Sequence, residues 1–225
     1  LVITKENPMI DPLELLEILQ KQTISFTTLV PSVLSSMVHL KKTSFALPAL
    51  RHLGCGGEAL KTAAADFWRS CTSAVHTPLL LHNRYGPTEC AINALLFGPG
   101  MMHTDDTEDQ NDVPIGWPSC HRHISIDSRI DAPGELILAG EGIALGYVGS
   151  KPEPIASFQD NLRGAGQDYH TGDLVSRCFR NGTSGNGCVR FIGRRDSQVK
   201  LLGQRIDLSE IEATIGNLSE VDACV

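Results

Sequence analysis

Helix-like and strand-like segments alternate over about the first 95 residues, and this alternation limits the possible folds more than any other feature of the sequence. Such alternation is typical of a layered α/β domain with a largely parallel sheet. Asp11 is a good N-cap and Pro12 suits the first helical position, which predicts a helix over residues 12–21. The other elements expected here are strands at 24–30, 50–53 and 79–82 and helices at 31–40 and 60–69.

After Gly98 the sequence changes character, because short strands replace the alternation of strands and helices. Residues 103–112 carry five acidic residues and almost nothing apolar, so we expect a solvated loop there. Gly, Pro and Asn separate the later strands, which favours an antiparallel barrel or sheet. Ser209 and Glu212 stand at the spacing of a capping box. The expected elements are strands at 124–126, 135–138 and 188–192, a polar hairpin tip at 180–187 and a helix at 208–215.

Composition excludes several classes of function. The 19 Lys and Arg against 26 Asp and Glu give a net charge of −7, and no stretch gathers the basic residues, so nucleic acid is not an expected partner. No apolar run approaches the roughly 20 residues of a membrane span, and the first residues lack the regions of a signal peptide, which points to a cytoplasmic protein. The seven cysteines are scattered without CxxC spacing, and the sequence therefore supports neither a disulfide framework nor a zinc site.

Three Gly-containing segments stand at the ends of expected strands, where an open α/β sheet usually binds its ligand. GCGGE at 54–58 is a candidate nucleotide loop, although a Gly-rich turn before a helix is more often plain structure. NRYGPTE at 83–89 combines an amide, an aromatic ring, a hydroxyl and a carboxylate in one short loop. In YHTGDL at 169–174, Asp173 could accept both hydroxyls of a ribose, or could simply cap its own tight turn.

These residues belong to longer motifs. YGPTE at 85–89, GELILAGEGIALGY at 134–147, YHTGDL at 169–174 and GRRDSQVKLLGQRIDLSEIE at 193–212 resemble four successive core motifs of nonribosomal peptide synthetase adenylation domains. The motifs stand in the order and at the separations of that family, and GGEAL at 56–60 is similar to its adenine-side loop. The resemblance extends over nearly the whole chain.

The resemblance implies an ATP site with Mg²⁺. Thr88 would contact the α-phosphate, Glu89 would help to hold Mg²⁺, and Lys200 lies in the mobile C-terminal part that the family uses in catalysis. Asp196 matches the family hinge between the two half-reactions. The implied ATP-binding residues are Gly57, Glu58, Ala59, Asn83, Tyr85, Asp173 and Arg194.

The resemblance also implies a pocket for the substrate side chain. Its positions here are Leu29, Leu53, Cys55, Arg84, Ile92 and Asn93. A buried guanidinium without a partner is costly, so Arg84 predicts a large substrate with an acceptor-rich side chain, such as a carboxylate or an acylated hydroxamate of siderophore synthesis. The alternative is that Arg84 turns outward and pairs with a surface acid. Leu145 stands where the family usually has Arg.

Combining the residue patterns with the resemblance, we expect an α/β chain in three parts. Residues 1–112 would form a layered α/β subdomain, 113–195 a β-barrel-like subdomain, and 196–225 the start of a small α+β C-terminal subdomain. The Gly-rich phosphate loop, the Asp that binds the substrate amino group and the terminal lysine of the family have no counterpart among the 225 residues. The chain is therefore expected to be at best feebly active by itself.

The implied reaction joins an amino acid to AMP and then to a thiol. The carboxylate attacks the α-phosphate, pyrophosphate leaves, and a phosphopantetheine thiol on a peptidyl carrier domain takes the acyl group. The expected partners are the amino acid, that carrier domain and neighbouring synthetase domains. Two alternatives remain open: an acyl-CoA synthetase-like ligase, which uses free coenzyme A, and an inactive interaction segment of a megasynthase.

Overall fold

The computed structural model describes residues 11–38, 47–72, 79–99, 111–128, 132–148, 157–160, 166–178 and 188–216. The chain forms two compact units, Leu1–Tyr85 with Leu95–Gly116 and Gly86–Ala94 with Trp117–Val225. None of the described helices is long and apolar enough to cross a membrane.

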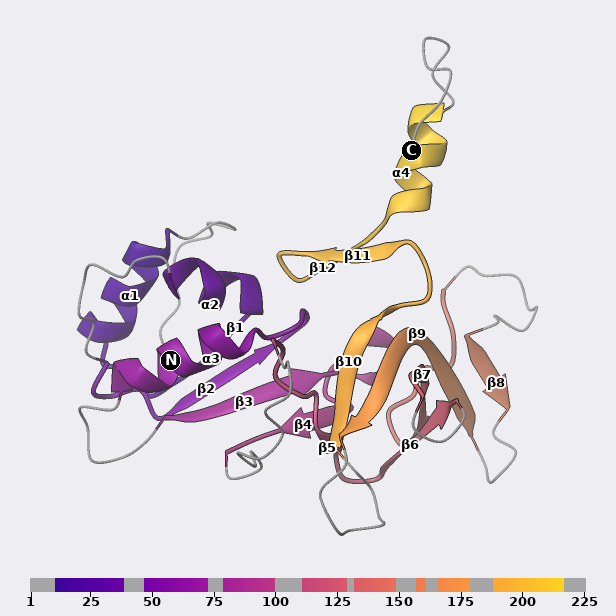
Figure 1. The fold of residues 1–225 in the computed structure, drawn as a ribbon, viewed down its shortest axis with the longest axis horizontal. Helices are drawn as coiled ribbons and strands as arrows, with labels where there is room; N and C mark the ends of the chain where they lie inside the picture. Colours follow the sequence, from indigo (N-terminus) through magenta and orange to yellow (C-terminus); the bar gives the residue numbers. More distant parts are fainter. Residues whose placement is uncertain are drawn as a thin grey trace. The chain divides into compact units, whose positions relative to one another are not determined.

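The first unit confirms the predicted alternation of strands and helices. Its helices are α1 (Pro12–Lys21), α2 (Pro31–Val38) and α3 (Thr62–Thr72), and its strands are β1 (Phe26–Leu29), β2 (His52–Gly56), β3 (Leu80–Tyr85) and β4 (Leu95–Phe97). β1, β2 and β3 pair in parallel and β4 pairs with β3 in the antiparallel direction. The three helices lie together on one side of β2 and β3 (Figure 1). Asp11 caps α1 as predicted, since its carboxylate accepts from the Leu13 N–H at 2.8 Å.

The core of this unit packs α2 and α3 against the sheet. Trp68 of α3 is fully buried and its indole N–H donates to the Leu34 carbonyl of α2 at 3.3 Å. Leu53 of β2 and Leu60 are also fully buried. Burial of each such side chain contributes about 1.5 to 3 kcal/mol relative to exposure, so this core stabilises the first unit.

Two strands of the first unit are longer than the sequence predicts. The predicted strand at 79–82 runs on to Tyr85, and the strand predicted at 50–53 begins at His52 and ends at Gly56. Parallel pairing of Cys55 with Asn83 and of Gly56 with Arg84 continues the ladder beyond the apolar run. The expectation of loops at 54–56 and 83–85 was therefore wrong, because pairing between strands outweighs the local preference of Gly and Asn for turns.

The second unit consists mainly of antiparallel strands, as expected. Its elements are the 3₁₀ helix η1 (Thr88–Cys90), the strands β5 (Trp117–Pro118), β6 (Arg122–Asp127), β7 (Gly134–Gly140), β8 (Phe158–Asp160), β9 (Gln167–Cys178), β10 (Cys188–Arg194), β11 (Gln198–Leu201) and β12 (Gln204–Asp207), and the helix α4 (Leu208–Gly216). The main sheet has the order β10-β9-β7-β6, with β8 on β9, and β11 and β12 form a separate hairpin. Among the described strands, β6 and β10 are the two ends of this sheet. The described strands therefore do not confirm the predicted barrel. The boundaries proposed at 112 and 195 remain predictions.

Two local predictions in this unit were wrong. YHTGDL is not a tight turn, because it lies inside the long strand β9. The last helix begins at Leu208, and the Asp207 carboxylate accepts from the Ser209 N–H at 3.0 Å, so Asp207 and not Ser209 caps it. The predicted hairpin tip at 180–187 and most of the acidic loop at 103–112 lie outside the described residues.

Candidate nucleotide site

The loop that carries Glu89 is tightly folded. A side chain on Gly86 would lie 1.8 Å from the Ile92 carbonyl oxygen, so only glycine fits there. Ala91 and Ile92 both have positive φ values, 50° and 70°, which L-residues rarely adopt. For a β-branched residue such as Ile92 this backbone is strained, and the surrounding contacts must hold it in place.

Glu89 is the centre of a buried polar cluster. It is 7% exposed, and its Oε1 accepts from the Tyr147 hydroxyl at 2.5 Å and from Arg205 Nη1 at 2.9 Å. Burial alone would raise the pKa of this carboxyl, but the Tyr147 hydroxyl, the main chain and the Arg205 guanidinium outweigh burial, and the pKa lies below its ordinary value. Glu89 is therefore held ionised.

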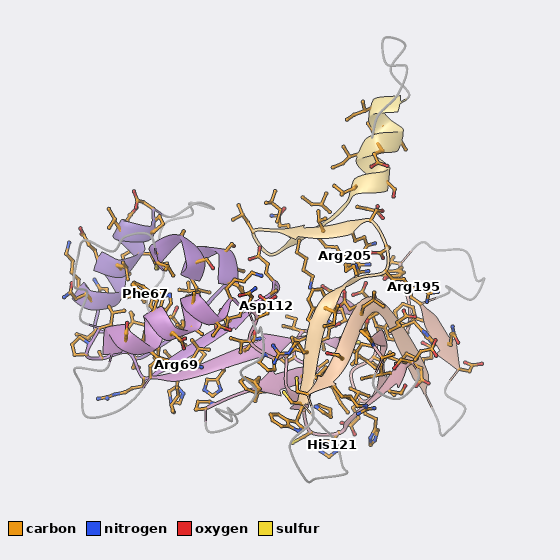
Figure 2. The ribbon with its side chains drawn as sticks, in the orientation of Figure 1. Phe67, Arg69, Asp112, His121, Arg195 and Arg205 are labelled. Carbon is orange, nitrogen blue, oxygen red and sulfur yellow. The ribbon has the colours of Figure 1, made fainter. Side chains whose placement is uncertain are left out.

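Tyr147 and Arg205 come from distant parts of the second unit. Tyr147 follows β7, and Arg205 lies on β12 of the hairpin, where Figure 2 labels it. The ring of Phe158 lies between those of Tyr147 and Tyr169, at centroid distances of 5.6 Å and 5.0 Å. Burial raises the pKa of Tyr169, and the nearby Glu89 raises it further. Sequence reasoning did not assign roles to Tyr147 or Arg205, although both lie within motifs that carry the resemblance.

The cluster offers one acceptor that could bind a cation. Glu89 Oε2 is buried and has no hydrogen-bond partner among the described residues. Mg²⁺ in nucleotide sites usually takes one or two carboxylates together with substrate phosphates and water. Within the described part of the chain, no group of three or more His, Cys, Asp or Glu is placed to hold a metal ion. Glu89 therefore fits the role of a single protein ligand to Mg²⁺ and does not form a complete metal site.

Asp173 and Arg194 form a second buried pair. Arg194 Nη1 donates to Asp173 Oδ1 at 2.5 Å, and the side chains of Arg194 and Asp173 are 12% and 4% exposed. Asp196 accepts from Arg194 Nε at 2.7 Å and from Nη2 at 2.6 Å, so one guanidinium joins two carboxylates. The hydrogen bond from Arg194 lowers the pKa of Asp196. Three residues predicted from the sequence are thus brought together.

A bulge in β9 presents Asp173. Tyr169 and His170 pair with Leu138 and Ile137, and the pairing resumes where Leu174 meets Glu135. Between these pairs β9 has three residues, 171–173, and β7 has only Leu136. The Thr171 hydroxyl donates to the Leu136 carbonyl at 2.8 Å and accepts from the Asp173 N–H at 3.0 Å. The bulge, and not a turn, therefore sets the direction of the Asp173 side chain.

The adenine-side residues predicted from the sequence lie in the first unit, and several have structural roles there. The Glu58 carboxylate accepts from the Ser32 N–H at 2.8 Å, in the first turn of α2. Asn83 is buried, its amide donates to the carbonyls of Val113 and Pro114 at 3.3 and 2.9 Å, and its Oδ1 lies 3.8 Å from Cys55 Sγ. Tyr85 ends β3 and is buried, and Gly57 has a positive φ of 93°. The roles of Gly57, Glu58, Ala59, Asn83 and Tyr85 toward adenine remain predictions.

The predicted substrate-pocket positions do not share one face of the sheet. Leu29, Cys55 and Asn83 pair across β1, β2 and β3 and so lie on the same face, with Leu53 two residues before Cys55. Arg84 alternates to the opposite face, where its guanidinium carbon lies 6.0 Å from the centre of the Phe26 ring. Burial raises the pKa of the Cys55 thiol to about 12, so this thiol is no nucleophile.

The Arg84 side chain extends from β3 over Gly54 of the neighbouring strand β2. A side chain on Gly54 would come within 2.9 Å of Thr28 Oγ1 and 3.3 Å of the Arg84 guanidinium carbon. On the same face His52 Nδ1 lies 3.4 Å from His82 Nε2. Burial lowers the pKa of His82, and the charge of Arg84 lowers it further. This face is polar and cationic, in contrast to the face of Leu53 and Cys55.

The remaining predicted residues are exposed. Thr88 opens η1, Lys200 lies on β11 opposite Arg205, and Ile92 and Asn93 lie in the loop after η1. Leu145, the departure from the family pattern, is 97% exposed. Thr88 precedes Glu89 in η1, and its contact with the α-phosphate remains a prediction.

Comparison with known proteins identifies the family. Residues 1–148 match the sequence profile of the family described as AMP-binding enzyme. Enterobactin synthase component F of Escherichia coli (strain K12) is 31% identical over 239 residues, which take in 100% of this chain and 17% of that protein. The chain thus spans about a sixth of the length of this relative.

Two solved structures have the same fold. An NRPS protein containing adenylation and PCP domains superposes with a TM-score of 0.76 and 27% identity, covering 96% of this chain and 36% of that one. The Vibrio cholerae adenylation domain AlmE, in complex with glycyl-adenosine-5'-phosphate, gives a TM-score of 0.75 and 26% identity, covering 94% of this chain and 39% of that one. The chain belongs to the AMP-binding enzyme family and, within it, to the adenylation domains of nonribosomal peptide synthetases.

Proposed function

We propose that this chain contributes to the ATP-dependent activation of an amino acid and to its transfer to a phosphopantetheine thiol on a carrier domain. Two observations in the second unit carry the proposal: Glu89 keeps one buried oxygen without a partner among the described residues, and Asp173 forms a buried pair with Arg194. One solved relative contains adenylation and PCP domains, and another holds glycyl-adenosine-5'-phosphate, an aminoacyl-adenylate of the kind expected as product.

In the first half-reaction, an oxygen of the amino-acid carboxylate attacks the α-phosphorus of ATP. The bond from that phosphorus to the oxygen bridging to the β-phosphate breaks, and pyrophosphate leaves with its electron pair. Glu89 would hold Mg²⁺, which offsets the negative charge of the phosphates. Thr88 would donate a hydrogen bond to the α-phosphate, and Arg194 would add positive charge beside it.

Asp173 would bind the ribose hydroxyls, as the resemblance implies. Its carboxylate is buried and paired with Arg194, which in turn holds Asp196. Ribose would therefore bind as Arg194 shifts its hydrogen bonds from Asp173 toward Asp196 and the nucleotide. Lys200, on the hairpin, and Asp196, at the expected hinge, would act when the C-terminal part rotates between the two half-reactions.

For the substrate, we propose an amino acid with a large acceptor-rich side chain, either a carboxylate or an acylated hydroxamate of siderophore synthesis. The choice rests on the Arg84 guanidinium, which lies with Thr28 and His82 on the face of the sheet opposite Leu29, Leu53 and Cys55. One relative of the chain is named Enterobactin synthase component F. The alternative that Arg84 turns outward is kept, because its guanidinium lies over the ring of Phe26, which is 55% exposed.

A pyrophosphate-exchange survey of the complete adenylation domain tests the function and the substrate together. We expect exchange that depends on a polar amino acid and that falls at least about tenfold in Arg84→Ala, since a charge-assisted hydrogen bond contributes about 1.5 to 3 kcal/mol. Arg51→Ala, which removes an exposed arginine immediately before β2, is the matched control. Preference for Leu, Val or Phe that Arg84→Ala leaves unchanged would reject the substrate proposal.

Supplying either a carrier domain or free coenzyme A to the same domain separates the remaining alternatives. Thioester formation on the carrier alone supports the peptide synthetase function. Thioester formation on coenzyme A would favour an acyl-CoA synthetase-like ligase, and absence of both exchange and ATP binding would favour an inactive interaction segment.

A further inference from the structure

Glu135 is a buried carboxylate that the proposed reaction does not use. It lies on β7 in the apolar run GELILAG, and it is 9% exposed, next to the fully buried Leu136. Glu is almost never buried in this way unless it is paired, because removing an ionised carboxylate from water is costly. Its position therefore indicates a specific role.

The two oxygens of Glu135 have different partners. Oε1 accepts from the Gly172 N–H at 2.9 Å, and Oε2 accepts from Arg195 Nη1 at 3.1 Å. His170 Nδ1 lies 3.7 Å from Oε2. Arg195 follows directly after β10, where Figure 2 labels it. One oxygen thus binds the main chain of the β9 bulge, and the other binds the guanidinium of Arg195.

Gly172 is the middle residue of the bulge that presents Asp173. Its N–H is bound by Glu135, and its carbonyl accepts from the Arg195 N–H at 2.8 Å. Asp173, which follows Gly172, and Arg194, which precedes Arg195, pair directly with each other. Glu135 therefore holds the peptide between Thr171 and Gly172, and the Arg195 main chain holds the next peptide, between Gly172 and Asp173.

Besides Glu135, the Gly172 backbone is held by the Arg195 N–H at its carbonyl and by Arg194 Nη1, which donates to the preceding Thr171 carbonyl at 3.2 Å. The Gly172 φ of 71° is in the left-handed region, where glycine is freer than other residues. Without Glu135, the peptide between Thr171 and Gly172 would keep only the bond from Arg194 to its carbonyl, so it would be freer to rotate and to shift the Asp173 side chain. A buried N–H left without an acceptor is also costly, which favours a new conformation of the bulge.

We propose that Glu135 is a positioning residue for nucleotide binding, which holds the Gly172 peptide so that Asp173 is directed at the ribose. This inference rests on the proposed role of Asp173 in the adenylation reaction. Glu135 does not touch the nucleotide, and it acts only through the bulge.

The test compares binding of ATP and 2′-deoxy-ATP to the complete adenylation domain by calorimetry. If Asp173 binds the ribose hydroxyls, the wild-type domain prefers ATP, and Glu135→Ala reduces that preference about tenfold, the loss expected for a hydrogen bond to a charged group. Glu135→Gln keeps an oxygen that can accept from the Gly172 N–H, so it retains the preference within about threefold. Glu141→Ala, an exposed carboxylate that follows β7, is the matched control and leaves the preference unchanged.

Asp173→Ala separates this inference from the function on which it rests. Loss of the ribose preference in Asp173→Ala, with the preference intact in a folded Glu135→Ala variant, would overturn the positioning role alone. An unchanged preference in Asp173→Ala would overturn the ribose role itself. If Glu135→Ala does not fold, Glu135→Asp takes its place, because its shorter side chain withdraws the carboxylate from Gly172. Equal preferences in the Asp and Gln variants would then overturn the proposal.

Discussion

Arg205 Nη1 lies 2.9 Å from Glu89 Oε1, although 116 residues separate the two in the sequence. This ion pair joins the β11–β12 hairpin to the loop that carries the predicted Mg²⁺ ligand. Arg205 donates to Oε1, and Oε2 of the same carboxylate remains without a partner among the described residues. The pair therefore leaves one Glu89 oxygen for a cation while it holds the hairpin in place.

Arg205→Ala is expected to destabilise the complete domain by about 1 kcal/mol near neutral pH, a modest value because the Arg205 side chain is 41% exposed. The pKa of Glu89 is lowered in the folded protein, so the pair stabilises the fold above the ordinary carboxyl pKa and loses this effect as the pH falls through the lowered pKa. Urea unfolding should thus show a difference from wild type at pH 7 that shrinks in acid. The exposed Arg177→Ala is the control. A difference that grows in acid would contradict the assigned sign.

Gly172→Ala is expected to destabilise the domain by about 1 to 2 kcal/mol, since an L-residue at a φ of 71° is strained. The added Cβ would also lie 2.7 Å from Arg194 Nη2 and would displace the guanidinium. Thermal unfolding together with ATP binding measures both effects. Gly166→Ala is the matched control, because its φ is also positive, at 122°, but its Cβ would meet nothing within 4 Å. Equal ATP affinity in the two variants would show that Arg194 is not displaced.

Asp173→Ala is expected to reduce ATP use at least about tenfold, because it would remove the two charge-assisted hydrogen bonds that we propose between Asp173 and the ribose. The variant should remain folded, since Arg194 keeps its two bonds to Asp196. Pyrophosphate exchange over a range of ATP concentrations measures the loss, with the exposed Asp160→Asn as control. An unchanged Michaelis constant and turnover for ATP would remove Asp173 from the site.

Asp196→Ala is expected to affect the two half-reactions unequally. Asp196 binds Arg194 through both oxygens, and Oδ1 also accepts from the Gln198 N–H at 3.1 Å, so it connects the end of β10 with the start of the hairpin. A change at a hinge alters the balance of conformations more than the chemistry of either step. Pyrophosphate exchange and thioester formation should be measured on the same preparation. Equal losses in both would count against the hinge assignment.

Much of the fold could be predicted from local sequence. Asp11 and Pro12 start α1 where predicted, since capping depends on neighbouring residues only. The β-branched and apolar runs gave the positions of β1, β7 and β10. The ends of β2 and β3 could not be predicted in this way. They depend on the pairing of Cys55 with Asn83, which are far apart in the sequence.

The candidate site was only partly predictable. The motifs identified Glu89, Asp173, Arg194 and Asp196, and the structure brings the last three together. The bulge at Gly172 depends on the register between β9 and β7, and the partners of Glu89 depend on folding of distant segments. Glu135 is a charged residue within an apolar strand, and this pattern could have predicted a buried carboxylate with hydrogen-bond partners.

Direct detection of the aminoacyl-adenylate tests the central claim. The complete adenylation domain is mixed with ATP, Mg²⁺ and a panel of amino acids that includes acidic and hydroxamate-bearing members, quenched within one turnover, and analysed by mass spectrometry. We expect an aminoacyl-AMP that forms with one class of polar amino acid, and its yield should fall at least about tenfold in Glu89→Ala, through loss of a charged ligand. Release of ADP, or an adenylate yield that is the same in Glu89→Ala as in wild type, would contradict this expectation.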